Sequence, residues 1–267
     1  MEKDTRELWY DPRLKVSVTV ADATSAARAL ARGHLAGPAS SYFLAKALAA
    51  VSLLAAETEE PDETVSIQMK CDGPLGGFNV ECSRDGALRG YTERKTLDDF
   101  DCRGKAPDET AAVGQRRLQV TRSVPGRIIS QGISNSLDGY IAGSLQRKAR
   151  IFLEAATGED GEVLEARGLL VEAMPDSAWA ISNAEAATVG KNGKKLSLAV
   201  SARTFLKRLG LASAEKKSSS PLFFKCRCSR ERIEAILAAL PRSERDSLPP
   251  DAAITCHMCG RTWTLGG

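Results

Sequence analysis

Residues 223–240 read FFKCRCSRERIEAILAAL and, after a proline-rich spacer, residues 254–263 read ITCHMCGRTW. Four cysteines stand there in two short pairs, Cys226 with Cys228 and Cys256 with Cys259. Zinc in proteins takes four sulfur or nitrogen ligands at tetrahedral corners, with Zn–S distances of about 2.3 Å. Each pair can place both of its sulfurs on the same side of a turn. We therefore predict that the four cysteines hold one Zn²⁺ per chain as thiolates.

The residues around the two pairs predict a small C-terminal zinc-binding domain over residues 221–267. Ser229 can cap a helix that Pro241 would end. The apolar residues expected on one face of that helix are Ile233, Ile236, Leu237 and Leu240. Gly260, directly after the last cysteine, suits the left-handed backbone that such turns need. So small a domain buries too little apolar surface to fold unaided, and metal binding would supply roughly 10–16 kcal/mol.

The residues alone leave the role of this site open. The zinc can be an inert structural clip, and His257 can in principle replace one ligand, although four thiolates already complete the shell. Reduced core cysteines without metal are a further alternative. Disulfide formation would eject the metal and remove most of the folding free energy, so the site has a physical capacity for switching. The basic residues expected to offset the thiolate charge are Lys225, Arg227, Arg230, Arg232 and Arg261.

The first part of the chain, residues 1–175, is predicted to form an α+β domain of mostly antiparallel strands with packed helices. Helices are expected over residues 22–32, 38–57 and 136–146, and the apolar residues of the second run almost all round it, so it should be buried. Strands are expected over residues 65–69, 78–82, 87–92, 117–122, 127–131, 149–154 and 168–173. Short spacing and glycine-bearing turns favour antiparallel pairing over a doubly wound sheet.

Residues 176–220 are predicted to form a helical linker. Helix-forming pieces over residues 183–188 and 196–209 flank a basic loop, and residues 215–221 have the polar composition of a flexible connection. The linker is short, and its helices are expected to be marginal.

Composition and charge are those of a soluble globular protein, with 43% hydrophobic and 27% charged residues. A net charge of +3 is too weak to argue for a nucleic-acid or membrane partner. Residues 1–15 lack the apolar core of a signal peptide, and the apolar run over residues 42–56 is expected to be too short for a bilayer. Seven cysteines, an odd number, favour reduced thiols or metal over a disulfide framework. We expect a cytoplasmic protein.

The remaining candidate residues carry little sign of catalysis. Cys71 and Cys82 fall in strand patterns and are expected in the core, whereas Cys102 stands in a polar stretch. His34 follows a helix end, where it is expected to complement the helix dipole. His257 is the only other histidine, so the sequence offers few residues for a histidine-based catalytic triad. No enzyme is predicted.

The whole chain resembles the heat-shock protein 33 family, also called the 33 kDa chaperonin. The C-x-C and C-x-x-C pairs, entered through Phe223-Phe224 and followed by residues 229–232 (SRER), look very like its signature. Upstream segments that match in order are residues 72–76 (DGPLG), 89–91 (RGY), 137–140 (LDGY) with Ser144 and Gln146, and 168–170 (GLL) before Met174-Pro175. The resemblance covers nearly all of the chain, and the zinc motif is its specific part.

The resemblance implies a redox-regulated holdase chaperone. In such proteins the reduced, zinc-bound domain keeps a metastable linker folded against the N-terminal domain. Oxidants such as hypochlorous acid, or peroxide with unfolding stress, convert the cysteines to disulfides and release zinc. The freed segments then expose apolar surface that binds unfolded client proteins, and a homodimer forms. Carried over here, the disulfides would join Cys226 with Cys228 and Cys256 with Cys259, and residues 196–209 would supply part of the client-binding surface.

Two other functions stay open. A zinc-ribbon-like RNA-binding protein would use the arginines beside the cysteines and Trp263, which could stack on a base, although the near-neutral charge argues against it. A constitutive holdase with a purely structural zinc would be equally active when reduced and oxidised. The slightly basic charge also differs from relatives of this family, which are usually acidic.

Overall fold

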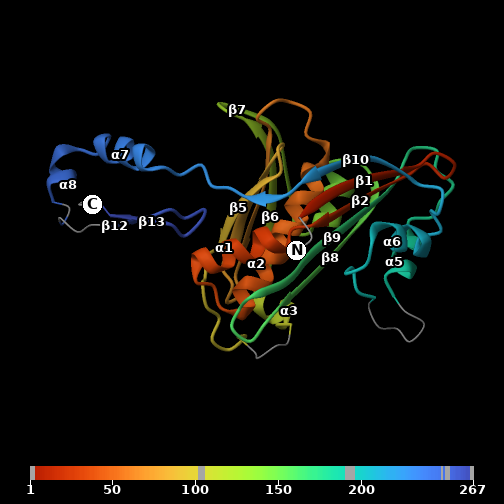
Figure 1. Ribbon diagram of the computed structural model, residues 1–267, viewed down its shortest axis with the longest axis horizontal. Helices are drawn as coiled ribbons and strands as arrows, with labels where there is room; N and C mark the ends of the chain where they lie inside the picture. Colours follow the sequence, from red (N-terminus) through yellow and green to blue (C-terminus); the bar gives the residue numbers. More distant parts are fainter. Residues whose placement is uncertain (1–3, 102–105, 190–195, 248, 250–252, 265–267) are drawn as a thin grey trace.

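The computed structural model describes residues 4–101, 106–189, 196–247, 249 and 253–264. Two β-sheets enclose one apolar helix, and the C-terminal residues extend to one side of them (Figure 1). The chain is an α+β protein, as the sequence predicts, and its strands pair antiparallel with the exception of one short parallel pair.

The first sheet has five strands in the order β10-β1-β2-β9-β8. Its strands are β1 (Thr5–Asp11), β2 (Val16–Asp22), β8 (Lys148–Thr157), β9 (Val163–Ala173) and β10 (Glu215–Pro221). The strands β1 and β2 are absent from the sequence prediction. Charged residues mask the alternation in β1 (TRELWYD), whereas the prediction overlooks the pattern of β2 (VSVTVAD). β2 alternates well enough to bury Val16 and Val18 completely.

The second sheet has six strands in the order β11-β5-β4-β3-β6-β7. Its strands are β3 (Thr64–Cys71), β4 (Gly77–Ser83), β5 (Ala87–Thr92), β6 (Arg116–Val124), β7 (Arg127–Ser134) and β11 (Phe223–Phe224). The strands predicted from sequence over residues 65–131 are all present. β11 pairs parallel to β5, with Phe223 opposite Ala87 and Phe224 opposite Leu88.

Helix α2 (Pro38–Leu54) lies between the two sheets and is buried on all sides, with a short 3₁₀ turn (Ala55–Glu57) after it. Pro38 occupies its first turn, as predicted. By length and composition, the segment Pro38–Glu57 could cross a membrane. The expectation of too short a run concerns residues 42–56, and it does not hold for the whole segment. However, 83% of it is buried inside the protein, which is the environment of a core helix.

Three shorter helices pack around this core: α1 (Thr24–His34), α3 (Glu109–Val113) and α4 (Leu137–Gly143). α1 covers the end of α2 next to β5, where Leu30 is fully buried. It begins two residues later than the sequence predicts, because β2 continues to Asp22.

Residues 176–221 differ in part from the predicted helical linker. Helices α5 (Ser182–Ala187) and α6 (Ala202–Arg208) are present, and Phe205 and Leu206 pack with Trp9 of β1 in a separate apolar cluster. The helix predicted over residues 196–209 is therefore shorter than expected. Residues 215–221, predicted as a flexible connection, form β10 and pair with residues 5–10 of β1, with a shift of register between Leu8 and Trp9.

The C-terminal residues contain α7 (Arg230–Ala238), α8 (Arg242–Asp246) and a hairpin of β12 (Ala253–Thr255) and β13 (Thr262–Thr264). The predicted cap is present, because the Ser229 hydroxyl accepts a hydrogen bond from the Arg232 amide at 3.3 Å. Only Ile233 of the predicted apolar face is buried, whereas Ile236 is 56% exposed. So little burial agrees with a segment that needs a metal to fold.

Candidate metal centre

The four predicted cysteines come together. One ligand atom from each of Cys226, Cys228, Cys256 and Cys259 lies within 4.8 Å of the others. The Sγ atoms of Cys226 and Cys256 are 3.8 Å apart, and those of Cys228 and Cys259 are 3.4 Å apart. Sulfurs at the corners of a tetrahedron with a Zn–S distance of about 2.3 Å stand roughly 3.8 Å apart. The arrangement and its all-sulfur donor set therefore fit a tetrahedral zinc ion.

The first cysteine pair is positioned by the strand that precedes it and the helix that follows. β11 ends at Phe224, two residues before Cys226, and Ser229 caps α7 directly after Cys228. Arg227, between the two cysteines, donates hydrogen bonds to the hydroxyls of Thr64 (2.8 Å) and Ser83 (3.1 Å). The first half of the centre is thus tied to the ends of β3 and β4 in the six-stranded sheet.

The second pair lies in the tight turn between β12 and β13. The Cys256 amide donates to the Arg261 carbonyl at 2.9 Å, and the Gly260 amide donates to the Cys256 carbonyl at 2.8 Å. Gly260 has a φ of 72°, the left-handed conformation predicted for it. This turn places Cys256 and Cys259 on the side that faces the first pair.

The turn also docks on β5 of the six-stranded sheet. The Gly90 amide of β5 donates to the Met258 carbonyl at 3.1 Å, and the ring of His257 meets the Tyr91 ring edge-on at 5.9 Å. His34 Nε2 donates to the Gly90 carbonyl at 2.9 Å. His34 lies in the last turn of α1, the position expected from the sequence, and burial lowers the pKa of its imidazole.

The thiols differ in acidity. Burial by itself would raise the pKa of Cys226, but hydrogen bonds from the Cys228 backbone and the neighbouring thiols lower it to about 7. Burial raises the pKa of Cys228 and of Cys259. Four thiolates so close together therefore need a cation, and a bound divalent metal would supply that charge.

Three of the basic residues expected beside the thiolates contact other groups. Arg230 pairs with Glu234 at 3.1 Å, Arg232 donates to the Arg227 carbonyl at 3.5 Å, and Arg261 lies over the Trp263 ring at 5.6 Å. Arg89 of β5, which the sequence does not single out for this role, interacts with Cys226 and pairs with Glu81 at 2.6 Å.

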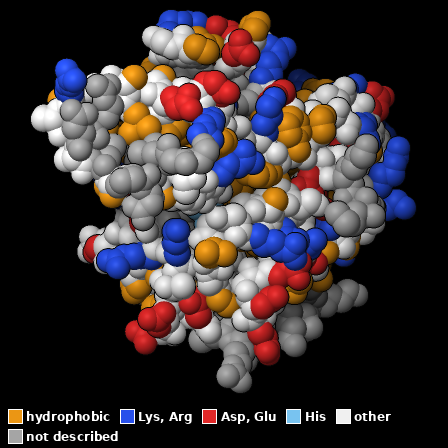
Figure 2. All heavy atoms as spheres, turned by 60° about the vertical axis from the view of Figure 1, so that its left-hand side comes forward, with side chains coloured by type: hydrophobic (Ala, Val, Ile, Leu, Met, Phe, Trp, Pro, Cys, Tyr) orange, Lys and Arg blue, Asp and Glu red, His pale blue; other side chains and the backbone are white. Residues whose placement is uncertain are grey.

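On the face of the molecule that carries this segment, basic side chains are interspersed with acidic ones (Figure 2). They do not gather into one continuous basic surface there. This distribution does not favour the RNA-binding alternative, which needs a basic path for phosphates.

The two other cysteines within the described residues, Cys71 and Cys82, do not join the centre. Cys82 is fully buried in β4, where burial raises its pKa to about 11, and Cys71 is partly exposed at the end of β3. Cys102 lies outside the described residues. His257 is not part of the four-cysteine cluster, so four sulfurs remain the donor set.

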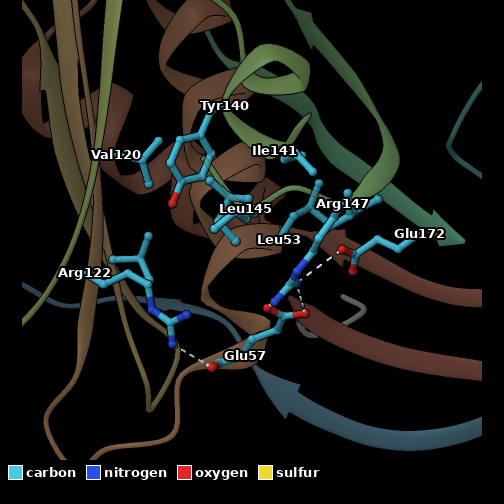
Figure 3. A pocket seen from close by; sticks show the side chains of 12 residues that line it. Leu53, Glu57, Val120, Arg122, Tyr140, Ile141, Leu145, Arg147 and Glu172 are labelled. Atoms are coloured by element: carbon cyan, nitrogen blue, oxygen red, sulfur yellow. Dashed lines mark hydrogen bonds and ion pairs between the residues drawn. The ribbon is translucent and has the colours of Figure 1, made fainter. Parts of the chain in front are cut away.

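A second group of charged residues lines a cavity of about 20 Å³ near the end of α2 (Figure 3). The Arg147 guanidinium contacts Glu57 at 2.6 Å and the buried Glu172 at 3.3 Å. Arg122 donates to the Glu57 carbonyl at 2.8 Å. A cavity that admits about one water molecule cannot hold an organic substrate, and these ions pair with each other. We assign this group a structural role.

Comparison with known proteins gives a consistent result. The family model described as Hsp33 protein matches residues 10–265. The 33 kDa chaperonin of Symbiobacterium thermophilum is 30% identical over 252 residues, which cover 87% of this chain and 84% of that protein. That of Lacticaseibacillus paracasei is 29% identical over 268 residues, with coverages of 92% and 90%.

The fold is likewise similar to a solved structure. The crystal structure of the 33 kDa chaperonin from Thermotoga maritima matches with a TM-score of 0.82 at 17% identity. The match covers 99% of this chain and 95% of that one. At this level of identity the likeness establishes the fold.

Proposed function

This chain belongs to the Hsp33 family, and from that premise we propose that it is a redox-regulated holdase. In this proposal it is not an enzyme: it binds unfolding proteins under oxidative stress and prevents their aggregation. Relatives named chaperonins support the chaperone role. The observation that supports the redox switch is the cluster of four free sulfurs at the point where the C-terminal segment joins the two sheets.

The chemistry needs a two-electron oxidant, such as peroxide or hypochlorous acid, for each disulfide. Two thiolates form one S–S bond and give two electrons to the oxidant, which becomes water, or chloride and water. Thiolate ligands are lost in this step, so zinc and the folding free energy of residues 221–267 are lost with them.

The pairing taken from the family, Cys226 with Cys228 and Cys256 with Cys259, fits an opening of the centre. Each of these bonds is local to one short segment. Bonds between the segments, such as Cys226 to Cys256, would instead cross-link them and keep the centre closed. Local pairing therefore lets the turn of the second pair leave the N-terminal domain.

The proposed domains are residues 1–175 for client binding and dimerisation, 176–220 as a metastable linker, and 221–267 as the zinc switch. The linker packs on the five-stranded sheet through an apolar cluster, in which Phe205 and Leu206 of α6 pack with Trp9. When the switch opens, this apolar surface would become available to unfolded clients. We further propose that activation is accompanied by homodimer formation and takes place in the cytoplasm.

The test combines two measurements on one sample. Zinc release is followed with a chromogenic chelator while the protein is oxidised, and aliquots are added to a thermally aggregating client. We expect one zinc per chain to be released and protection to increase in step with it. Equal protection by the reduced and the oxidised protein would instead support a constitutive holdase with structural zinc. Salt-dependent RNA binding by the reduced protein, without protection of the client in either state, would support the RNA-binding alternative.

A further inference from the structure

The outer edge of β5 is covered by two short pieces of the C-terminal segment and by one side chain. The Phe223 amide donates to the Gly86 carbonyl just before β5 at 3.0 Å, and the Lys225 amide donates to the Leu88 carbonyl at 3.1 Å. Further along, the Gly90 amide donates to Met258, and His34 donates to the Gly90 carbonyl. The outward-facing backbone groups along this edge therefore form their hydrogen bonds with residues 223–225, with the turn of the metal centre and with His34.

The C-terminal segment that covers this edge binds the sheets mainly through backbone hydrogen bonds. We call residues 215–225 the strap, because they run from the edge of the five-stranded sheet, at β1, to the edge of the six-stranded sheet, at β5. The β10 part of the strap (EKKSSSP) is exposed at every residue except Ser220. Leu222, which is 4% exposed, is its main apolar anchor, and Phe223 and Phe224 are half-buried.

The backbone of the strap passes very close to Gly86, the residue just before β5. A Cβ on Gly86 would overlap the Pro221 carbonyl, and Gly86 has a φ of 91°. The crossing therefore depends on a glycine that leaves room for an extended backbone. The space beside Gly86 thus fits the backbone of an extended chain.

The strap is continuous with the metal centre. The Lys225 amide donates to the Leu88 carbonyl, and Cys226 follows directly in the chain. The second cysteine pair covers the next part of the same edge through Met258. Opening the centre thus removes the anchor at the end of the strap and the cover of Gly90 at the same time.

We propose that the edge of β5 is a binding site for one extended apolar segment of an unfolded protein, which takes the place of residues 223–225 when the metal centre opens. This inference rests on the proposed function and adds a place and a binding mode to it. The chain's own Phe-Phe segment shows the chemistry of the occupant: backbone amides aligned with β5 and a side chain packed against the apolar core. Bonds to backbone do not depend on sequence, which suits a partner that varies.

The opposite edge of this sheet does not meet the same conditions. β7 carries Ile128 and Ile133, which are 61% and 49% exposed, and no described strand pairs with its outer side. Since no described strand is paired with the outer edge of β7 in the closed state, we expect oxidation to leave access to that edge unchanged. The edge of β5 is the one that the metal centre controls.

The test uses a fluorescent peptide with the sequence of residues 219–225 (SSPLFFK) and the full-length protein. Three variants of the peptide carry one N-methyl group each, at the amide of Phe223, Phe224 or Lys225. Methylation of the first or third removes a donor to β5, whereas the amide of Phe224 faces away because neighbouring residues alternate. The variant methylated at Phe224 is the matched control, with the same side chains and the same number of methyl groups.

We expect the oxidised, zinc-free protein to bind the unmodified peptide and the control alike, and the variants methylated at Phe223 or Lys225 at least roughly tenfold more weakly. The reduced, zinc-loaded protein should bind none of them. Equal binding of all four peptides to the oxidised protein, no binding by it, or equal binding to both states would overturn the inference. If any of these is found while oxidation still protects a client from aggregation, the edge is wrong and the proposed function stands; if oxidation gives no protection, the proposed function itself fails.

Discussion

Gly33 at the end of α1 lies with its backbone against the backbone of Gly260 in the turn of the second cysteine pair. A Cβ on Gly33 would lie 2.7 Å from the Cys259 carbonyl oxygen, and one on Gly260 would overlap the Gly33 carbonyl. Neither position therefore has room for a side chain. The close approach brings the Met258 carbonyl within hydrogen-bonding reach of Gly90, so docking of the metal centre depends on this glycine pair.

Replacing Gly260 by alanine should loosen this docking. Gly210→Ala is a matched control, because Gly210 has a φ of 74°, against 72° for Gly260, but nothing lies within 4 Å of its Cβ position. Both changes should lower stability by about 1–2 kcal/mol through backbone strain. Only Gly260→Ala should also speed hydrogen exchange at the Gly90 amide, measured by NMR in the zinc-loaded protein. Equal exchange in the two variants would contradict a steric role for the glycine pair.

Removing one sulfur should abolish tight metal binding. Cys256→Ser leaves three sulfur ligands, and we expect the zinc content of the purified protein, measured with a chelator after denaturation, to fall well below one per chain. Cys71→Ser is the control, since Cys71 is also a partly exposed thiol but lies outside the cluster. It should keep its zinc. A Cys256→Ser protein that retained a full equivalent would show that these four residues are not the ligand set.

The departure of the strap from β1 should be visible in the fluorescence of Trp9. Trp9 is 3% exposed, it pairs with Lys216 of β10, and Lys216 Nζ lies 5.2 Å from its ring. A variant with Trp179→Phe and Trp263→Phe keeps Trp9 as the only tryptophan. We expect its emission to shift to the red when zinc is released by oxidation. A spectrum unchanged after complete zinc release would mean that β10 stays paired with β1.

The buried ion pair of Glu63 and Arg122 should make stability depend on pH. Glu63 is 1% exposed, contacts Arg122 Nε at 2.7 Å and accepts the Glu59 amide at 2.8 Å. Burial alone would raise the pKa of Glu63, but the hydrogen bonds from Arg122 and the backbone bring it below its usual value. A lowered pKa stabilises the fold above the unfolded-state pKa of about 4.3, and this stabilisation is lost as the pH falls through the folded-state pKa.

Glu63→Gln should therefore lower the free energy of unfolding at pH 7 by about 3 kcal/mol, measured by urea denaturation, and by much less at pH 3. Glu60→Gln is the comparison, because Glu60 pairs with Arg127 on the surface, with both side chains about half exposed. Its effect should stay below about 1 kcal/mol at either pH. Equal losses for the two variants at pH 7 would show that burial does not strengthen the Glu63 pair.

Features that depend on local pattern could be predicted from the sequence. The spacing of the four cysteines, the cap at Ser229 and the apolar surface of α2 each follow from residues close together in the chain, and each is present. The order of the strands could not be derived in the same way, since pairing depends on contacts between distant residues.

Contacts across the fold account for the sequence predictions that were wrong. Residues 215–221 have a polar, serine-rich composition, and what makes them a strand is the row of backbone bonds offered by β1. Arg89 reaches Cys226 because β5 and the C-terminal segment meet in space, and this contact has no signal in the residues adjacent to the cysteines. The same holds for Gly33, whose need for a bare backbone comes from a turn near the other end of the chain.

The brevity of β11 has a consequence for recovery after stress. A captured polypeptide can extend along β5 beyond the two residues that β11 occupies, because the turn that bonds the Gly90 amide leaves as well. The longer contact therefore favours the bound client. Residues 223–225 can displace it only when the re-formed metal centre holds them close to β5, at a high effective concentration. Transfer of the client to a refolding system would then require reductant and metal to return, and dilution alone would not release the client.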